Sequence, residues 1–321
     1  MVVAAVALLL VGHRGGTETD GSVTASAVTA RPAGTLVFTF GTNRLMAIDV
    51  ASGRRTARKV PSVAACGPQM YVTGGHLVFA ARQRRRTVVF SVPVALDRPP
   101  RRLGAAHAFV PSATEGRVWL AGVDCTRSAM VGAREVTVDG DVTAETDRRI
   151  PAAWLAGAVS RGLVLARSRE LVVWDPETGE TGRPLAIQAV TATRGDLLAG
   201  CAAGADCSGL VVLDAATGRQ VLTRRPIEWD ARFSPDGSLL ATPARVDRHW
   251  RVALVEARSG RTTIVPGIRS RHYPQLSWAA SSGWLFVQTG PRRMMAYRPG
   301  LSRPVALPFR APRGAIAYIA G

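Results

Sequence analysis

The chain lacks most of the signatures that mark a catalytic site. Lys59 is the only lysine among 41 basic residues, aromatic residues make up 6% of the sequence, and there are four cysteines. It contains no nucleophile elbow, phosphate-binding loop, paired-carboxylate motif or Ser/His/Asp order. His76, His107, His249 and His272 fall in different parts of the sequence, and none lies at ligand spacing from a cysteine pair. We therefore expect no metal and no cofactor, and favour a binding protein over an enzyme.

The chain also lacks an apolar run long enough to cross a membrane. Residues 1–12 are apolar over about eleven positions, whereas a spanning helix needs about 20 residues and a signal-peptide core about 7 to 15. A signal peptide carries basic residues before its apolar core, but no basic residue precedes this run and Arg14 follows it. We interpret residues 1–12 as the remnant of a signal peptide or anchor whose start codon lies upstream, and residues 13–34 as a flexible linker. This predicts an extracytoplasmic protein, secreted or attached to the membrane through its N-terminus.

What the sequence does contain is a repeated turn. The pattern Asp-x-x-Ser/Thr-Gly occurs at 49–53, 175–179 and 214–218, and 256–260 has the same pattern with Glu in the first place. The carboxylate can accept hydrogen bonds from the amides that follow it, and glycine takes the positive φ that closes a tight turn. Each copy therefore predicts a hairpin between two strands.

The spacing of the repeats indicates a propeller. Apolar runs begin about every 40 residues, which is the length of a four-stranded propeller blade. The runs begin near Thr35, His76, Arg117, Leu163, Asp196, Ser238 and Trp284. Each blade is expected to hold strands a, b, c and d, with a glycine turn between a and b and the carboxylate turn between c and d. The a-to-b turns are predicted at Gly75, Gly116, Gly162, Gly195, Gly237 and Gly283.

The strand that is missing from the first blade is found at the C-terminal end of the repeats. The first blade has no strand a, whereas 314–321 has the pattern of a strand a and stops where the a-to-b turn would follow. We therefore predict an all-β, seven-bladed β-propeller over 35–321, closed by the C-terminal strand pairing into blade 1, which removes two open edges. The face of the a-to-b and c-to-d turns is called the bottom face, and the face of the b-to-c loops and d-to-a connections the top face.

Some repeats resemble known propeller families. The runs at 171–179 and 210–218 resemble quinoprotein-like (PQQ-like) repeats, and 233–242 resembles a WD40 or surface-layer (YVTN) blade. The Trp that usually follows the glycine in quinoprotein-like repeats is replaced by Thr56, Arg183, Leu222 and Thr263 or their neighbours. The resemblance thus implies an architecture shared by scaffolds, sensors and enzymes, and carries over no redox cofactor.

All four cysteines are predicted to lie on the top face. Cys201 and Cys207 bracket the b-to-c loop of blade 5, Cys66 precedes strand a of blade 2, and Cys125 ends strand b of blade 3. We expect two disulfides, Cys201–Cys207 within a loop and Cys66–Cys125 between blades, as in an oxidising compartment. The alternative is four unrelated buried thiols.

Arginines gather in the predicted b-to-c loops of the top face. This Arg crown comprises Arg44, Arg82, Arg84, Arg85, Arg86, Arg127, Arg167, Arg169, Arg245, Arg248, Arg292 and Arg293. With a net charge of +18, such a face attracts anionic partners, because guanidinium groups bind carboxylate and phosphate. We expect a monomer that binds a protein, an anionic polymer or an anionic lipid surface. Nucleic acid is not expected, since the crown lacks interleaved aromatics. Codon usage in a GC-rich genome is the other explanation of the excess arginine.

The central funnel offers a competing site. A propeller enzyme or redox-cofactor-binding protein would work from the top opening of the channel, where the strands a begin. The residues predicted there are Tyr71, His107, Trp154, Gln188, Asp230, Arg232 and Tyr273.

Overall fold

The computed structural model describes the chain from Arg31 onward with short gaps. The described residues are 31–40, 43–62, 70–83, 86–106, 108–124, 127–150, 154–167, 170–202, 207, 209–224, 227–228, 230–280, 283–313 and 315–320. The interpretations of residues 1–12 and of most of the linker fall outside these ranges. A compact unit spans Pro32–Gly321, and its described elements are all β-strands. No helix in the described ranges is long and apolar enough to cross a membrane.

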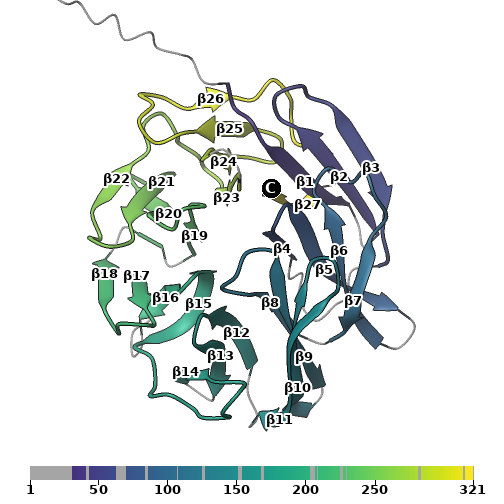
Figure 1. Cartoon of the computed structure of the whole chain (residues 1–321). Helices are drawn as coiled ribbons and strands as arrows, with labels where there is room; N and C mark the ends of the chain where they lie inside the picture. The colour runs from purple at the N-terminus through teal and green to yellow at the C-terminus, as the bar shows by residue number, and fades with distance from the viewer. Residues whose placement is uncertain are drawn as a thin grey trace, which may run out of the picture. The chain divides into compact units, whose positions relative to one another are not determined.

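The compact unit is a seven-bladed propeller, as predicted, with its sheets arranged around a centre (Figure 1). Blade 1 holds β27 (Ala315–Ala320), β1 (Thr35–Phe40), β2 (Arg44–Asp49) and β3 (Arg55–Lys59). Blade 2 holds β4 (Met70–Thr73), β5 (His76–Gln83), β6 (Arg86–Pro93) and β7 (Arg101–Ala105). Blade 3 holds β8 (Ala108–Pro111), β9 (Arg117–Asp124), β10 (Arg127–Thr137) and β11 (Val142–Ile150).

The remaining blades follow in chain order. Blade 4 holds β12 (Trp154–Val159), β13 (Gly162–Arg167) and β14 (Glu170–Trp174). Blade 5 holds β15 (Ile187–Arg194), β16 (Leu197–Ala202), β17 (Gly209–Asp214) and β18 (Gln220–Arg224). Blade 6 holds β19 (Arg232–Phe233), β20 (Leu239–Val246), β21 (His249–Glu256) and β22 (Thr262–Ile264). Blade 7 holds β23 (Gln275–Trp278), β24 (Leu285–Gln288), β25 (Met294–Tyr297) and β26 (Val305–Ala306).

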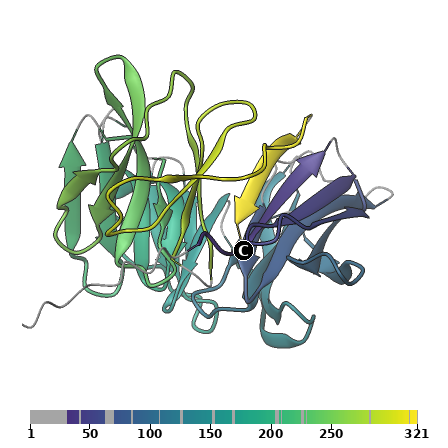
Figure 2. The ribbon, with the colours of Figure 1, turned by 90° about the horizontal axis from the view of Figure 1, so that it is seen from above.

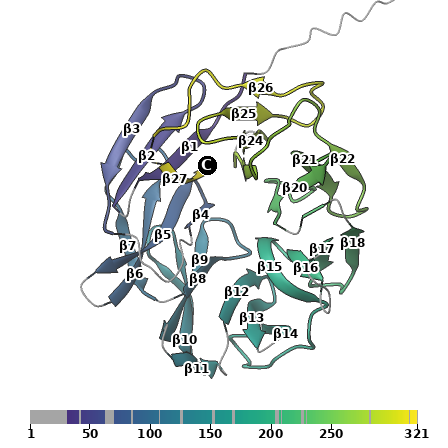
Figure 3. The same ribbon diagram turned by 180° about the vertical axis from the view of Figure 1, so that it is seen from behind.

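Within each blade the strands pair antiparallel and run between the two faces of the ring (Figure 2). The strands a lie closest to the centre when the ring is seen from either face (Figures 1 and 3). The strands b begin at the predicted Thr35, His76 and Arg117, and the other four begin within one residue of the prediction, at Gly162, Leu197, Leu239 and Leu285. Local turn chemistry therefore places the strands accurately along the chain.

The carboxylate turns have the predicted hydrogen bonds. Oδ1 of Asp214 accepts from the backbone amides of Ala216 at 3.0 Å and Thr217 at 3.1 Å, and Gly218 at the end of the turn has a φ of 72°. Asp49 and Asp175 bind the amides of their own turns in the same way. These hydrogen bonds satisfy amides that no strand partner reaches, so the turn sequence fixes the hairpin.

Blade 4 differs from the expected four strands. After β14 the chain makes only isolated bridges, Trp174 with Thr181 and Leu171 with Leu185. Pro184 lies between the two bridges and has no N–H to donate to a ladder. The outer strand of blade 4 is therefore replaced by a loop that touches β14 at two points.

The hydrophobic core lies between neighbouring blades. Val37 and Leu45 of blade 1 pack in one buried cluster with Leu77, Phe79 and other side chains of blade 2. Polar contacts also join the blades: the Ser91 hydroxyl donates to the Val138 carbonyl at 2.5 Å, across blades 2 and 3. Each blade is thus stabilised mainly by burying its faces against the next blade.

The C-terminal strand lies inside blade 1. β27 pairs antiparallel with β1, with Leu36 opposite Ala320 and Val37 opposite Ile319. A register shift occurs between Thr39 and Phe40. Blade 1 is consequently built from both ends of the propeller sequence.

Candidate functional site

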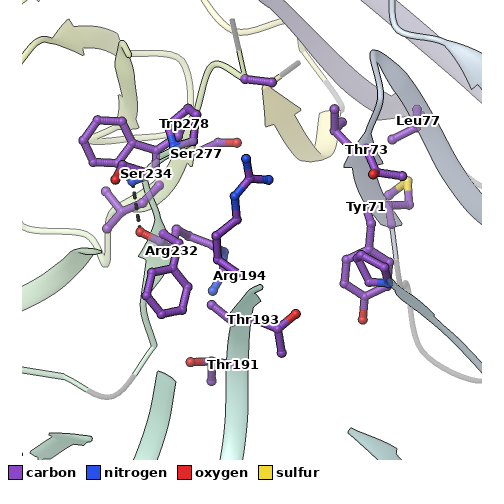
Figure 4. Close-up of a pocket in the computed structure, with 18 of the residues that line it drawn as sticks. Tyr71, Thr73, Leu77, Thr191, Thr193, Arg194, Arg232, Ser234, Ser277 and Trp278 are labelled. Atoms are coloured by element: carbon purple, nitrogen blue, oxygen red, sulfur yellow. Dashed lines mark hydrogen bonds between the residues drawn. The ribbon is translucent and has the colours of Figure 1, made fainter. Parts of the chain in front are cut away.

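A cavity of about 710 Å³ lies at the centre of the ring. Six blades contribute to its wall, and Figure 4 shows Arg194, Arg232 and Thr191 on one side with Tyr71, Thr73 and Leu77 opposite. The volume is within the range of about 300 to 1,000 Å³ that small-molecule sites occupy. The cavity is therefore large enough to hold a small ligand.

A charged cluster occupies the top of this cavity. Nη1 of Arg232 donates to Oδ1 of Asp230 at 2.6 Å and to the Ala231 carbonyl at 2.8 Å. The Tyr273 hydroxyl donates to Oδ2 of Asp230 at 3.3 Å. Trp278 supports the same segment from blade 7, because its indole N–H donates to the Arg232 carbonyl at 2.9 Å. Both the backbone and the side chain of Arg232 are therefore held in place.

The charge of Arg232 reaches tyrosines on two sides of the cavity. Burial raises the pKa of Tyr71, and Arg232 partly offsets that rise. Burial also raises the pKa of Tyr273, together with the carboxylates of Asp230 and Glu228, while Arg232 again acts in the opposite direction. Both hydroxyls are therefore protonated at neutral pH and can donate hydrogen bonds.

The bottom of the cavity has a second, looser pair of charges. Nη2 of Arg194 lies 3.9 Å from Oε2 of Glu115. This ion pair joins the a-to-b turn of blade 5 to that of blade 3. Both side chains are partly exposed, at 42% and 59%. Such a pair contributes little stability, roughly 0 to 1 kcal/mol, so both groups can turn toward a ligand.

The cluster at the top is linked to the b-to-c hairpin of blade 6. The Trp250 and Tyr273 rings meet edge to face with centroids 4.8 Å apart and planes at 69°. The Arg245 guanidinium lies over the Trp250 ring, 5.6 Å from its centroid. Tyr273 is thus packed from behind by Trp250 while 43% of its surface stays exposed.

Four of the seven predicted funnel residues line the cavity, namely Tyr71, Asp230, Arg232 and Tyr273. Trp154 begins β12 and is 56% exposed, and neither it nor the exposed Gln188 is part of the cavity wall. His107 lies outside the described residues. The structure therefore brings together the predicted residues of blades 2, 6 and 7.

The predicted Arg crown is partly described. Arg44, Arg82, Arg86, Arg245, Arg248, Arg292 and Arg293 are exposed near the b-to-c ends of blades 1, 2, 6 and 7. Arg167 ends β13 and is half-buried. Arg127 begins β10, but its side chain is not described. Arg84, Arg85 and Arg169 lie outside the described residues.

One of the two predicted disulfides is present. Cys201 and Cys207 are bonded across the b-to-c loop of blade 5, with their Cα atoms 4.9 Å apart. Cys66 and Cys125 lie outside the described residues, so their pairing stays a prediction. Within the described ranges there is no group of three or more His, Cys, Asp or Glu side chains that could hold a metal ion.

Sequence reasoning missed several residues of the cavity wall. Thr191, Thr193 and Arg194 come from β15, and Glu115 from the a-to-b turn of blade 3. Ala192 between the two threonines also lines the cavity, and a register shift between Val190 and Ala192 interrupts the alternation of β15, so its sequence pattern gave no signal for these residues. Trp278 and Ser277 of β23 also line the cavity, although Trp278 reads as an ordinary core residue.

Comparison with known proteins supports the fold. No family model matches the sequence, and no curated protein matches it. Among solved structures, that of puromycin hydrolase is 20% identical with a TM-score of 0.50, and the match covers 81% of this chain and 48% of that chain. TolB from Acinetobacter baumannii is 8% identical with a TM-score of 0.49, covering 89% of this chain and 66% of that chain. The chain thus spans about half the length of the puromycin hydrolase chain, and the likeness shows the propeller fold alone.

Proposed function

We propose that this propeller is a non-catalytic, extracytoplasmic binding protein whose Arg-rich top face binds an anionic partner, either an acidic protein or an anionic polymer. The observation that carries the proposal is the exposed set of arginines from blades 1, 2, 6 and 7. None of these guanidinium groups forms an ion pair with a described carboxylate. Arg245 lies over the Trp250 ring and Arg292 donates to the Ala311 carbonyl, but neither contact neutralises the charge, so it is available to a partner.

The bottom face differs in how its charges are used. Arg101 pairs with Asp139 at 3.4 Å, and Arg261 pairs with Glu256 within its own turn. Asp49 has a lowered pKa because the Ser52 hydroxyl and amide both donate to it. The carboxylates of the bottom face accept hydrogen bonds within the turns and neutralise neighbouring arginines. We therefore expect a strongly anionic partner to bind this face more weakly than the top face.

The top face is not free of acidic residues. Asp247 lies between Arg245 and Arg248 in the β20–β21 turn, and Glu170 begins β14. Both are exposed. The arginines outnumber them, so the field above this face is positive and attracts anions over a distance set by the salt concentration.

The proposed location depends on the disulfide and on the N-terminal sequence. The Cys201–Cys207 bond is typical of an oxidising compartment. The apolar segment at 1–12 is proposed to direct export and to hold the propeller at the membrane. We propose a monomeric propeller tethered in this way, with its binding face directed at a soluble or surface-bound partner.

Binding to an anionic polymer tests the role of this face. The variant has Arg82, Arg86, Arg245 and Arg248 all changed to Ser, and the probe is fluorescent polyglutamate of defined length. We expect the wild type to bind it with a steep salt dependence, since the Debye length shrinks from about 10 Å at 0.1 M to about 3 Å at 1 M salt. The variant should bind weakly at every salt concentration.

A matched control carries the same change in net charge on the opposite face. Arg54, Arg98, Arg258 and Arg298 are exposed beside the c-to-d turns, and all four are changed to Ser. We expect this control to keep most of the affinity of the wild type. Equal losses in both variants would mean that only net charge matters, and the Arg-rich face would then have no specific role.

A further inference from the structure

We propose that the top of the central cavity binds a single acidic sugar, a hydroxylated ring that carries a carboxylate, at a site separate from the Arg-rich face. The site is formed by Arg232, Asp230, Tyr71 and Tyr273, with Glu115 and Arg194 at the lower end. Nothing in the argument depends on the partner of the Arg crown.

Arg232 is positioned to bind the carboxylate. Its described hydrogen bonds use only Nη1, which Asp230 and the Ala231 carbonyl hold. The rest of the guanidinium fork is available to a carboxylate, which arginine binds through two parallel hydrogen bonds. Because Asp230 and Trp278 hold Arg232 before any ligand arrives, little side-chain entropy is lost on binding.

The balance of charge in the cavity wall favours a ligand that carries neutral hydrogen-bond donors as well as a negative charge. Arg194 and Arg232 are accompanied by Asp230 and Glu115, so the four ionised groups sum to zero. A carboxylate offers about four acceptor positions, and each oxygen of Asp230 accepts one described hydrogen bond. The remaining positions on Asp230 and those on Glu115 can accept from hydroxyl groups. A ligand that presents one carboxylate and several hydroxyls matches this pattern.

The two tyrosines supply hydrogen-bond donors and an apolar ring surface to the site. Both Tyr71 and Tyr273 line the cavity, and their protonated hydroxyls can donate to ring oxygens. Tyr273 is partly exposed and is held from behind by Trp250, so it offers a fixed apolar surface to the C–H face of a sugar. At about 710 Å³ the cavity has room for one ring with some water.

The location of the site also favours an acid. The top of the cavity, with Asp230, Arg232 and Tyr273, lies on the same face as the Arg crown, and the protein carries a net charge of +18. Positive potential is focused into concave sites with low-dielectric walls, which raises the local concentration of anions. An acidic sugar is therefore favoured over its neutral counterpart before any contact with Arg232 is made.

Calorimetric titration with matched sugars tests the proposal. The probes are glucuronate, glucose, which has the same ring without the carboxylate, and glucose 6-phosphate. We expect glucuronate to bind at least about tenfold more tightly than glucose, because a hydrogen bond to a charged group contributes on that scale. In Arg232→Gln the two affinities should become equal, while the exposed crown variant Arg248→Gln should keep the preference.

Other outcomes would overturn the proposal. Equal affinities of the wild type for glucose and glucuronate would show that Arg232 does not bind the carboxylate. If neither sugar bound, the cavity would not be a sugar site. Binding of glucose 6-phosphate without glucuronate would assign a phosphate site instead. Tyr273→Leu is a second variant that keeps Arg232 and its partners and should weaken both sugars about equally, with an unchanged melting temperature showing that the propeller is intact. Failure here leaves the polyglutamate result untouched, so the two proposals are tested separately.

Discussion

The indole N–H of Trp278 in blade 7 donates to the carbonyl of Arg232 in blade 6, with the two atoms 2.9 Å apart. Trp278 is 7% exposed, so the donor side of this part-buried hydrogen bond is shielded from water. It joins two blades at the wall of the cavity and fixes the backbone that carries Arg232.

We predict that Trp278→Phe destabilises the propeller by about 1 to 3 kcal/mol, because the part-buried carbonyl of Arg232 loses its donor. The measurement is the free energy of unfolding from urea denaturation. Trp154→Phe is the control, since Trp154 is 56% exposed, and it should change stability by no more than about 0.5 kcal/mol. A loss of the same size in both variants would contradict a specific role for the contact between the blades.

Deleting 314–321 tests the closure of the ring. β27 pairs with β1, so its removal exposes the inner edge of β1 and leaves blade 1 with three strands. Unpaired strand edges promote association between chains. We expect aggregation or a large fall in melting temperature, measured by light scattering and calorimetry. A truncated protein that stays monomeric and melts like the wild type would rule out this contribution of β27.

Acid should destabilise the protein through Glu135 in β10. Burial raises the pKa of this carboxyl, but hydrogen bonds from Ser112, Thr143 and Arg117 and the charge of Arg117 outweigh burial and lower the pKa overall. The pKa of Glu135 is therefore lower in the folded protein than the value of 4.5 in the unfolded chain. The ionised carboxylate contributes its full stabilisation of the fold above pH 4.5, and this contribution is lost as the pH falls through the pKa of the folded protein.

We therefore expect Glu135→Gln to be less stable than the wild type at pH 7, by about 1 to 3 kcal/mol, and to lose less stability than the wild type between pH 7 and pH 3. Urea denaturation at each pH gives both numbers. The exposed Glu145 lies in the neighbouring strand β11, and Glu145→Gln should follow the wild type. If the Glu135 variant had the pH profile of the wild type, the carboxylate would not contribute to acid sensitivity.

Gly200 in β16 lies too close to the neighbouring strand for a side chain. A Cβ at this position would be 1.7 Å from the Ala189 carbonyl oxygen in β15. We expect Gly200→Ala to separate the two strands and to cost at least about 1 to 3 kcal/mol, as overpacking does. Gly182→Ala is the control, because its Cβ would come no closer than 3.4 Å to the Val173 carbonyl. Comparable melting temperatures for the two variants would contradict the close approach of β15 and β16.

The cysteines should be oxidised in protein collected from its natural compartment. Mass spectrometry should show peptides linked through Cys201 and Cys207, and, as predicted from the sequence, through Cys66 and Cys125. Changing both Cys201 and Cys207 to Ser should cost about 2 kcal/mol, the loop-closure value for so short a loop. Quantitative alkylation of all four thiols under native oxidising conditions would instead place the protein in a reducing compartment.

The fold could be read from the sequence because its determinants are local. Asp214 and Gly218 define a turn within five residues, and the strands on either side alternate with a period of two. The same reasoning predicted a fourth strand in blade 4, where the structure has a loop with two bridges to β14. The repeat is otherwise regular there, and it hides the effect of Pro184, which cannot donate to a strand ladder.

The cavity was harder to predict because its wall comes from residues far apart in the sequence. Arg194 and Glu115 each lie in an ordinary hairpin turn, and only the curvature of the ring brings them within 3.9 Å. The contact of Trp250 with Tyr273 likewise joins two blades. Funnel residues at the starts of the strands a could be named, but which of them face the cavity depends on blade twist and connection length.

The pairing of β1 with β27 sets an order of assembly during synthesis. Blades 2 to 7 are each made from strands that are consecutive in the chain, so each can form soon after its own residues emerge. β1 must wait for β27, which is translated after every other described strand. Until then the ring stays open at blade 1, and the protein passes through an incomplete state with an unpaired strand edge.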